Sequence, residues 1–318
     1  MFEHILVPLD GSSLAECVLS HVIALATTHD ADVTLFRVLE KQPDRDRAAF
    51  VSPLDAHLDN VIAQAYLDEL AQHLSRAGVL VETAIASGSA AVQIVAYAQQ
   101  NEIDLIVMSS HGKSGLSSWN MSSVAQKVAA RAHRSVMIVH AYVPPSEEVD
   151  ILTYRRLLVP LDGSQRAEYV LPIAVSLARA HDARLVLAHV VHKPEMPRQL
   201  WTNDEEQALL DQFMACRQRR AASYLEEVRK RLPVEAESEL QESADVAGAL
   251  QALAEDEAFD LILLSAHGYS GSPRRTYGSV AANLIGYCST PLLIVQDLSG
   301  EQLVPSQAEL VTREHQGH

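Results

Sequence analysis

The chain has 318 residues, 48% of them hydrophobic, and a formal net charge of −16 at pH 7. This length predicts two domains, and the charge argues against nucleic acid as the main partner, because phosphate backbones bind to clustered lysine and arginine. No apolar run approaches the roughly 18 residues of a membrane span, and the opening "MFEHILVPLDGSS" contains no signal-type segment. We therefore expect a cytoplasmic protein without a membrane partner, and its three widely spaced cysteines fit a reducing compartment.

Apolar runs of strand length alternate with longer segments of helical period. In chain order, we expect strands near residues 4–9, 32–39, 79–86, 104–108 and 135–139, and helices near 13–29, 57–76, 90–101 and 122–132. The strands are apolar almost throughout, as in "DLIVM" and "VMIV", which indicates burial on both faces. Such alternation predicts an α/β fold with a doubly wound parallel sheet that has helices on each side.

The second half of the chain repeats the first. "ILVPLDGSS" at 5–13 matches "LLVPLDGSQ" at 157–165, and "DLIVMSSHG" at 104–112 matches "DLILLSAHG" at 260–268. The sequence therefore predicts two repeated domains, each a five-stranded parallel sheet flanked by helices. We expect domains at residues 1–142 and 154–298, a proline-containing linker at 143–153 and a flexible tail at 299–318.

Non-apolar residues recur where the predicted strands end, which is where a doubly wound sheet binds its ligand. The second repeat places there Asp162, Val190, Ser265, His267, Gly268, Gly278 and Ser279, with Arg274 and Arg275 in the last loop. The first repeat offers Asp10, Val38, Ser109, Gly112, Ser122 and Ser123. Small residues at a helix N-terminus let backbone N–H groups approach an anion. The pattern therefore predicts a phosphate site, with the other end of the ligand near the aspartate.

Each of these features also has a structural interpretation. Asp10 and Asp162 could serve only to accept hydrogen bonds from loop amides, beside a serine that begins a helix. His111 and His267 are more typical of hydrogen-bonded loop histidines than of a catalytic base. Neither has a second histidine or carboxylate at metal-ligand spacing, so we expect no metal–protein site.

These repeated motifs resemble universal stress proteins, in the tandem arrangement of two such domains, over nearly all of residues 1–297. In the ATP-binding branch of that family, the motif Gly-x2-Gly-x9-Gly-Ser/Thr meets the phosphates, and an aspartate and a valine lie near adenine and ribose. The second repeat departs from this pattern only at Ser265, whereas Ser109 and Ser122 replace both outer glycines of the first. The resemblance thus implies ATP or a related adenine nucleotide, with bound Mg left open, mainly in the second repeat.

The expected function is that of a stress-response regulator, and two alternatives remain. One is an interaction module that binds no nucleotide, as in the other branch of the family. The other is an enzyme such as an adenylyltransferase, which the absence of a His-x-Gly-His signature and of a nucleophile–base pair disfavours. We assign no catalytic residue, although slow ATP hydrolysis stays open.

We also expect the two repeats to pair as a pseudo-dimer through their last strands, 135–139 and 291–295. Both strands are short and apolar, and pairing would remove two exposed edges. The resembled family dimerises through this strand. The sequence does not decide whether two tandem chains then form a homodimer.

Overall fold

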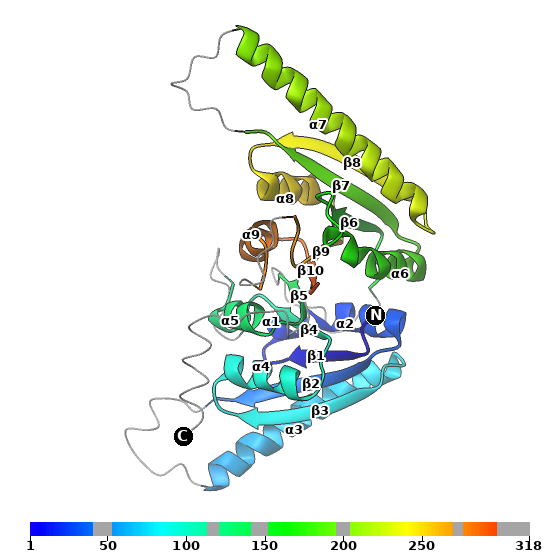
Figure 1. The fold of residues 1–318 in the computed structure, drawn as a ribbon. Coiled ribbons are helices and arrows are strands. Elements are labelled where there is room, and N and C mark those ends of the chain that lie inside the picture. The colour runs from blue at the N-terminus through cyan, green and yellow to red at the C-terminus, as the bar shows by residue number, and fades with distance from the viewer. Residues whose placement is uncertain (41–52, 113–120, 141–151, 195–203, 270–275, 298–318) are drawn as a thin grey trace. The chain divides into compact units, whose positions relative to one another are not determined.

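The computed structural model describes residues 1–40, 53–112, 121–140, 152–194, 204–269 and 276–297. They form two compact units, which consist mainly of Met1–Thr153 and of Tyr154–Ser272 with Tyr277–Leu292. In each unit, helices flank a parallel sheet (Figure 1). The expected α/β fold of two repeated domains is therefore confirmed.

The first repeat alternates strands and helices as its apolar pattern predicts. Its elements are β1 (His4–Pro8), α1 (Ser13–Glu16), α2 (Leu19–His29), β2 (Asp32–Leu39), α3 (Pro53–Arg76), β3 (Val81–Ser87), α4 (Ala90–Gln100), β4 (Leu105–Ser109), α5 (Ser123–Arg131) and β5 (Ser135–Val139). The strand order is β3-β2-β1-β4-β5. Because β1 lies between β2 and β4, the strand order reverses beside the carboxyl end of β1, where ligands bind in such sheets.

The second repeat has the same order of elements. They are β6 (Arg156–Pro160), the 3-10 helix η2 (Ala167–Val170), α6 (Leu171–His181), β7 (Arg184–His192), α7 (Asp204–Arg231), β8 (Ala236–Ser243), α8 (Val246–Asp256), β9 (Leu261–Ser265), α9 (Ser279–Tyr287) and β10 (Leu292–Val295). Its strand order, β10-β9-β6-β7-β8, places the reversal beside β6.

One expected helix is divided in the structure. The sequence predicts a single helix near 13–29, but α1 ends at Glu16 and α2 begins at Leu19. In the second repeat, η2 likewise precedes α6, and Pro172 lies in the first turn of α6. Proline has no backbone N–H and clashes with the preceding turn, so it favours a new helix at this point.

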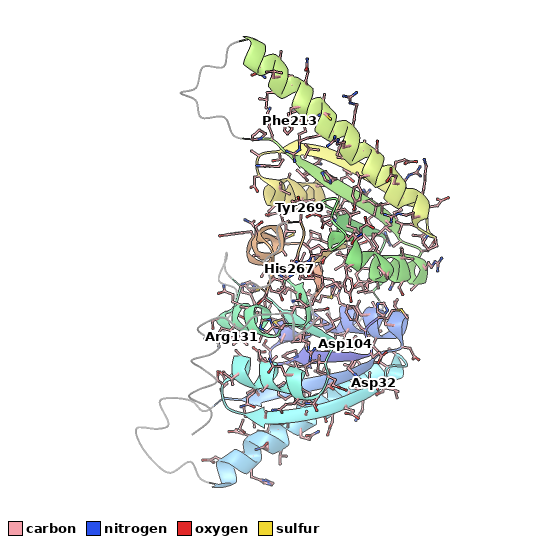
Figure 2. The ribbon with its side chains drawn as sticks, in the orientation of Figure 1. Asp32, Asp104, Arg131, Phe213, His267 and Tyr269 are labelled. Atoms are coloured by element: carbon pink, nitrogen blue, oxygen red, sulfur yellow. The ribbon has the colours of Figure 1, made fainter. Side chains whose placement is uncertain are left out.

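The sheets are buried at their centres and half-exposed at β3 and β8. Every residue of β4, β5 and β9 is buried, as the nearly continuous apolar runs predict. Asp104, labelled in Figure 2, precedes β4 and accepts hydrogen bonds from the N–H groups of Glu3 and His4 at 2.8 and 3.1 Å. Asp260 does the same for the residues that lead into β6. Each aspartate thereby fixes the start of the first strand of its repeat.

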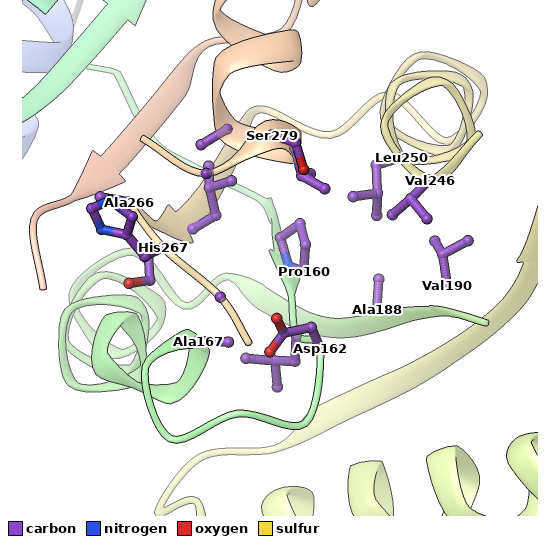
Figure 3. Close-up of a pocket in the computed structure, with 17 residues that line it drawn as sticks. Pro160, Asp162, Ala167, Ala188, Val190, Val246, Leu250, Ala266, His267 and Ser279 are labelled. Atoms are coloured by element: carbon purple, nitrogen blue, oxygen red, sulfur yellow. The ribbon is translucent and has the colours of Figure 1, made fainter. Parts of the chain in front are cut away.

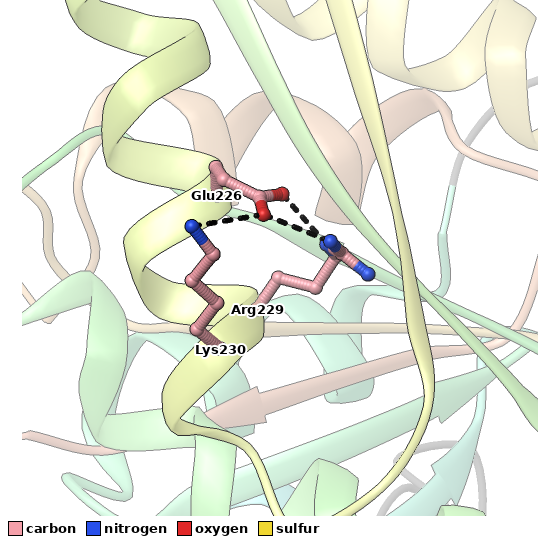
Figure 4. A network of polar contacts seen from close by, with 3 residues as sticks. All are labelled: Glu226, Arg229 and Lys230. Atoms are coloured by element: carbon pink, nitrogen blue, oxygen red, sulfur yellow. Dashed lines mark hydrogen bonds and ion pairs between the residues drawn. The ribbon is translucent and has the colours of Figure 1, made fainter.

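The surface of α7 carries a small ion network. Glu226 accepts hydrogen bonds from Arg229 at 2.7 and 2.8 Å, and Lys230 lies 3.4 Å away (Figure 4). The hydrogen bonds from Arg229 are the main reason why the pKa of Glu226 falls to about 2. These groups are exposed, so the network adds little to stability. No described helix is long and apolar enough to cross a membrane.

The imidazole of His29 is buried against Phe2, with ring centroids 5.4 Å apart. Burial, and then the charge of the N-terminus, lowers its pKa from 6.5 to about 4. His29 is therefore protonated near pH 6.5 in the unfolded chain but only near pH 4 in the folded chain. We expect His29 to lower the free energy of unfolding by about 1–2 kcal/mol as the pH falls from 7 to 5.

Urea denaturation of wild type and of His29→Leu at pH 7 and pH 5 checks this expectation. The variant should lose less stability than wild type between the two pH values, because it removes one protonation site. Equal losses in the two proteins would contradict the assignment.

Candidate functional site

A hollow of about 660 Å³, its open mouth included, lies at the carboxyl ends of β6, β7 and β9 in the second repeat. The hollow is lined by these second-repeat residues that we expected to bind nucleotide: Asp162, Val190, Ser265, His267, Gly268, Gly278 and Ser279 (Figure 3). Arg274 and Arg275, the remaining two, lie outside the described residues.

One side of the hollow is aliphatic. Ala188 and Val190 on β7 face Val246 and Leu250 on α8 (Figure 3). Of these, the sequence analysis named only Val190. Ala188 could have been found from strand alternation, since it lies two residues before Val190 and on the same face of β7. The α8 residues could not, because their approach to β7 depends on how the helix packs.

The carboxylate of Asp162 joins two loops at the opposite side. It accepts hydrogen bonds from the N–H and the hydroxyl of Ser164 at 2.9 and 2.6 Å and from the N–H of Tyr269 at 2.6 Å. A Cβ added to Gly268 would lie 2.1 Å from Asp162 Oδ2, so this close approach requires glycine. Asp162 therefore has the structural role that the sequence left open, and it also lines the hollow.

Gly278 precedes α9 in an ordinary extended conformation, with φ −68° and ψ 171°. An added Cβ would find its nearest neighbour, Ala266 O, at 3.5 Å, so neither backbone conformation nor space demands glycine there. Its consequence is that the N-cap residue of α9 has no side chain that could accept a hydrogen bond from the first turn. The first turn of α9 thus presents N–H groups and the positive end of the helix dipole to the hollow.

The matching position in the first repeat is capped. Ser122 has φ −56° and ψ 148°, and its hydroxyl accepts a hydrogen bond from Ala125 N at 3.2 Å. The Ser122 hydroxyl thus pairs with an N–H group of the first turn of α5. The corresponding N–H group of α9 receives no such hydrogen bond from its N-cap residue. The loss of glycine at residue 122 therefore changes the partners of the helix N-terminus rather than straining the backbone.

The first serine of the motif also differs between the repeats. Ser265 Oγ is buried and has no hydrogen-bond partner within the described part of the chain. Ser109 Oγ, its counterpart, interacts with Cys17 Sγ at 3.6 Å and accepts a hydrogen bond from His111 N at 3.3 Å. A buried hydroxyl without a partner is costly, and it suits a site that a polar ligand completes.

The first repeat otherwise reproduces the loop geometry of the second. Asp10 Oδ1 accepts hydrogen bonds from the N–H and the hydroxyl of Ser12 at 2.9 and 2.6 Å. A Cβ on Gly112 would lie 2.1 Å from Asp10 Oδ2. Val38 lies in β2, and Ser123 is the first residue of α5.

The loop histidine of the second repeat does not point toward the aspartate of its hollow (Figure 3). Figure 3 shows the ring of His267, a residue that is 1% exposed, directed away from Asp162. His111 Nδ1 forms a hydrogen bond with Ser110 Oγ at 2.8 Å. His111 thus matches the structural interpretation of a hydrogen-bonded loop histidine. In the described ranges, no group of three or more His, Cys, Asp or Glu side chains could hold a metal ion.

Comparison with known proteins gives the family. A sequence model described as the universal stress protein family matches residues 1–140 and, a second time, residues 153–296. The chain belongs to the universal stress protein family. Each match spans one repeat, so this is a tandem universal stress protein.

Two archaeal universal stress proteins are similar to one repeat each. MJ0531 of Methanocaldococcus jannaschii is 31% identical over 140 residues, which are 44% of this chain and 82% of that protein. MJ0577 of the same organism is 28% identical over 154 residues, which are 44% of this chain and 95% of that protein.

Solved structures of similar fold extend over both repeats. PA1789 from Pseudomonas aeruginosa PAO1, a functionally unknown protein, covers 98% of each chain with a TM-score of 0.68 and 14% identity. A universal stress protein from Archaeoglobus fulgidus DSM 4304 covers 93% of this chain and 98% of its own, with a TM-score of 0.61 and 19% identity. At such identities the likeness shows the fold alone.

Proposed function

We propose that this universal stress protein is a stress-response regulator that binds ATP or a related adenine nucleotide in its second repeat. The observation that carries the proposal is the hollow itself. It combines an aliphatic wall with an uncapped helix N-terminus, at the sheet edge where doubly wound folds bind nucleotides.

The aliphatic wall suits a nucleotide base. In this proposal a planar ring lies beside Val190 on β7 and the α8 side chains Val246 and Leu250, where its faces would contact only carbon atoms. Burial of this apolar surface would supply about 25 cal/mol for each Å² removed from water. The polar loop that contains Asp162 would then lie beside the ribose.

The first turn of α9 suits phosphate. Gly278 and Ser279 bring N–H groups and a hydroxyl to the hollow, and Gly268 lines it from the loop after β9. An anion at this point would interact with the helix dipole and with donors that have no other role in α9. The orphaned hydroxyl of Ser265 could complete its hydrogen bonding to such a ligand or to a water that accompanies it.

Two measurements on the full chain test the proposal. Mass spectrometry of small molecules released from the purified, denatured protein should detect an adenine nucleotide, and calorimetric titration of ATP should give saturable binding. GTP titrated in parallel serves as the control for base recognition. A protein that carries no nucleotide and gives no heat with ATP would instead support the interaction module.

The Ser265 hydroxyl, which has no hydrogen-bond partner among the described residues, gives a prediction with two opposite effects. Without nucleotide, Ser265→Ala should leave the melting temperature unchanged or raise it slightly, because a buried hydroxyl without a partner is removed. ATP affinity should fall by about fivefold, roughly 1 kcal/mol, the value of one hydrogen bond.

Ser109→Ala is the matched control, because that hydroxyl accepts a hydrogen bond from His111 N. It should lower the melting temperature and leave ATP affinity unchanged. The opposite outcome, with Ser265→Ala losing stability but no affinity, would mean that Ser265 has a structural role.

A further inference from the structure

Phe36 and Ala188 occupy the same position in the two repeats. Phe36 pairs with Pro8 of β1, and Ala188 pairs with Pro160 of β6. Their carbonyl groups accept equivalent hydrogen bonds, from Leu9 N and Leu161 N, each at 2.8 Å. The two side chains therefore leave the sheet at the same point and on the same face, and they differ in size by an aromatic ring.

The opposing helices also correspond. α4 and α8 have 11 residues each, and Ile94 and Leu250 are the fifth residue of their helices. In the second repeat, Ala188 points from β7 toward Leu250, and both line the hollow (Figure 3). Ile94 is buried on α4. In both repeats, this space therefore lies between the second strand and the helix that follows the third strand.

In the first repeat an aromatic pair lies across this space. The ring of Phe36 packs against Tyr97 of α4, with centroids 4.6 Å apart and planes tilted by 33°. Phe36 is 1% exposed, so the ring is fully enclosed. Tyr97 lies three residues after Ile94, on the same face of the helix. The ring thus extends from β2 along the face of α4 that corresponds to the α8 wall of the hollow.

We infer that Phe36 is a built-in plug which fills, in the first repeat, the space that Ala188 leaves open for a planar ligand group in the second. The inference rests on the proposed nucleotide site. It adds a residue that determines which of the two repeats can bind the nucleotide. One side chain on the second strand, rather than the phosphate motif alone, then limits the chain to one nucleotide.

The direct test is to place the plug in the second repeat. Ala188→Val and Ala188→Phe form a size series, and ATP affinity is measured by calorimetry on the full chain. We expect a small loss for valine and a loss of at least tenfold for phenylalanine. Leu187→Phe is the control, because it enlarges the neighbouring side chain on the opposite face of β7, which does not line the hollow, and it should leave the affinity unchanged.

The melting temperature of Ala188→Phe without nucleotide distinguishes a destabilised fold from a stable fold whose binding space is filled. If the second repeat has room for a ring, Ala188→Phe should melt within a few degrees of wild type, since overpacked cores lose more than this. A large fall in melting temperature would overturn the inference, because it would mean that the space is not there. Unchanged ATP affinity in a stable Ala188→Phe variant, or two ATP per wild-type chain, would overturn it as well.

Failure of the proposed function has a different signature. If wild type binds no ATP while Ala188→Phe keeps its melting temperature, the nucleotide assignment is wrong, but the difference in filling between the two repeats is supported.

Discussion

Replacement of Asp162 by alanine is expected to weaken ATP binding by about 1–3 kcal/mol, roughly 5- to 150-fold, the scale of hydrogen bonds to a charged group. Two effects contribute. The variant removes a carboxylate that lines the hollow. It also releases Tyr269 N and Ser164 N, which hold together the loops after β9 and β6. The loops that shape the polar end of the site would then separate, and calorimetric titration of ATP measures the result.

Asp10→Ala is the control for the structural part of this effect. Asp10 accepts the same pair of hydrogen bonds from Ser12 that Asp162 accepts from Ser164. Both variants should lose a similar, small amount of stability, about 1 kcal/mol, because these bonds are at least partly exposed. Only Asp162→Ala should lose affinity. Equal ATP affinity in the two variants would remove Asp162 from the site.

Replacement of Gly268 by alanine is the second change with a large expected effect. The new Cβ would lie 2.1 Å from Asp162 Oδ2, far inside van der Waals contact, so the carboxylate and the loop must move apart. The methyl group would also stand beside the N–H groups that we assign to phosphate. We expect ATP affinity to fall at least tenfold, about 1.4 kcal/mol or more.

Gly112→Ala imposes the same clash in the first repeat, where the Cβ would lie 2.1 Å from Asp10 Oδ2. The two glycine variants therefore share their steric cost and differ in the site they touch. Gly112→Ala should melt like Gly268→Ala yet bind ATP like wild type. Loss of affinity in Gly112→Ala, with Gly268→Ala unaffected, would assign nucleotide binding to the first repeat.

Much of the fold could be read from the sequence because its signals are local. Continuous apolar runs predict the strands β4 and β9, and the helical period predicts the helices α4 and α8. The internal repeat predicts the two domains. The division of the helix after β1 was missed, since a break at residues 17 and 18 carries no glycine or proline in the first repeat. In the second repeat, Pro172 indicates that a new helix begins at this point.

The candidate site was predictable to a different extent at its two ends. The polar end follows strand termini, so Asp162, Gly268 and Gly278 could be placed by motif spacing. The aliphatic wall depends on which helix face meets β7, and a single-letter pattern does not give that packing. Gly278 lies at the start of α9, where the sequence pattern predicts that backbone N–H groups can approach an anion. The structure relates it to an uncapped helix rather than to a backbone conformation that only glycine adopts.

Hydrogen exchange measured by mass spectrometry, with and without saturating ATP, shows whether ATP binds in the second repeat. With ATP, we expect slower exchange of amides in residues 265–269 and 278–281 and in the loop after β6, where the hollow lies. The matching amides of residues 109–112 and 122–125 should exchange at the same rate with and without ATP. Protection of the first-repeat amides alone, or no protection anywhere at saturating ATP, would show that ATP does not bind in the second repeat.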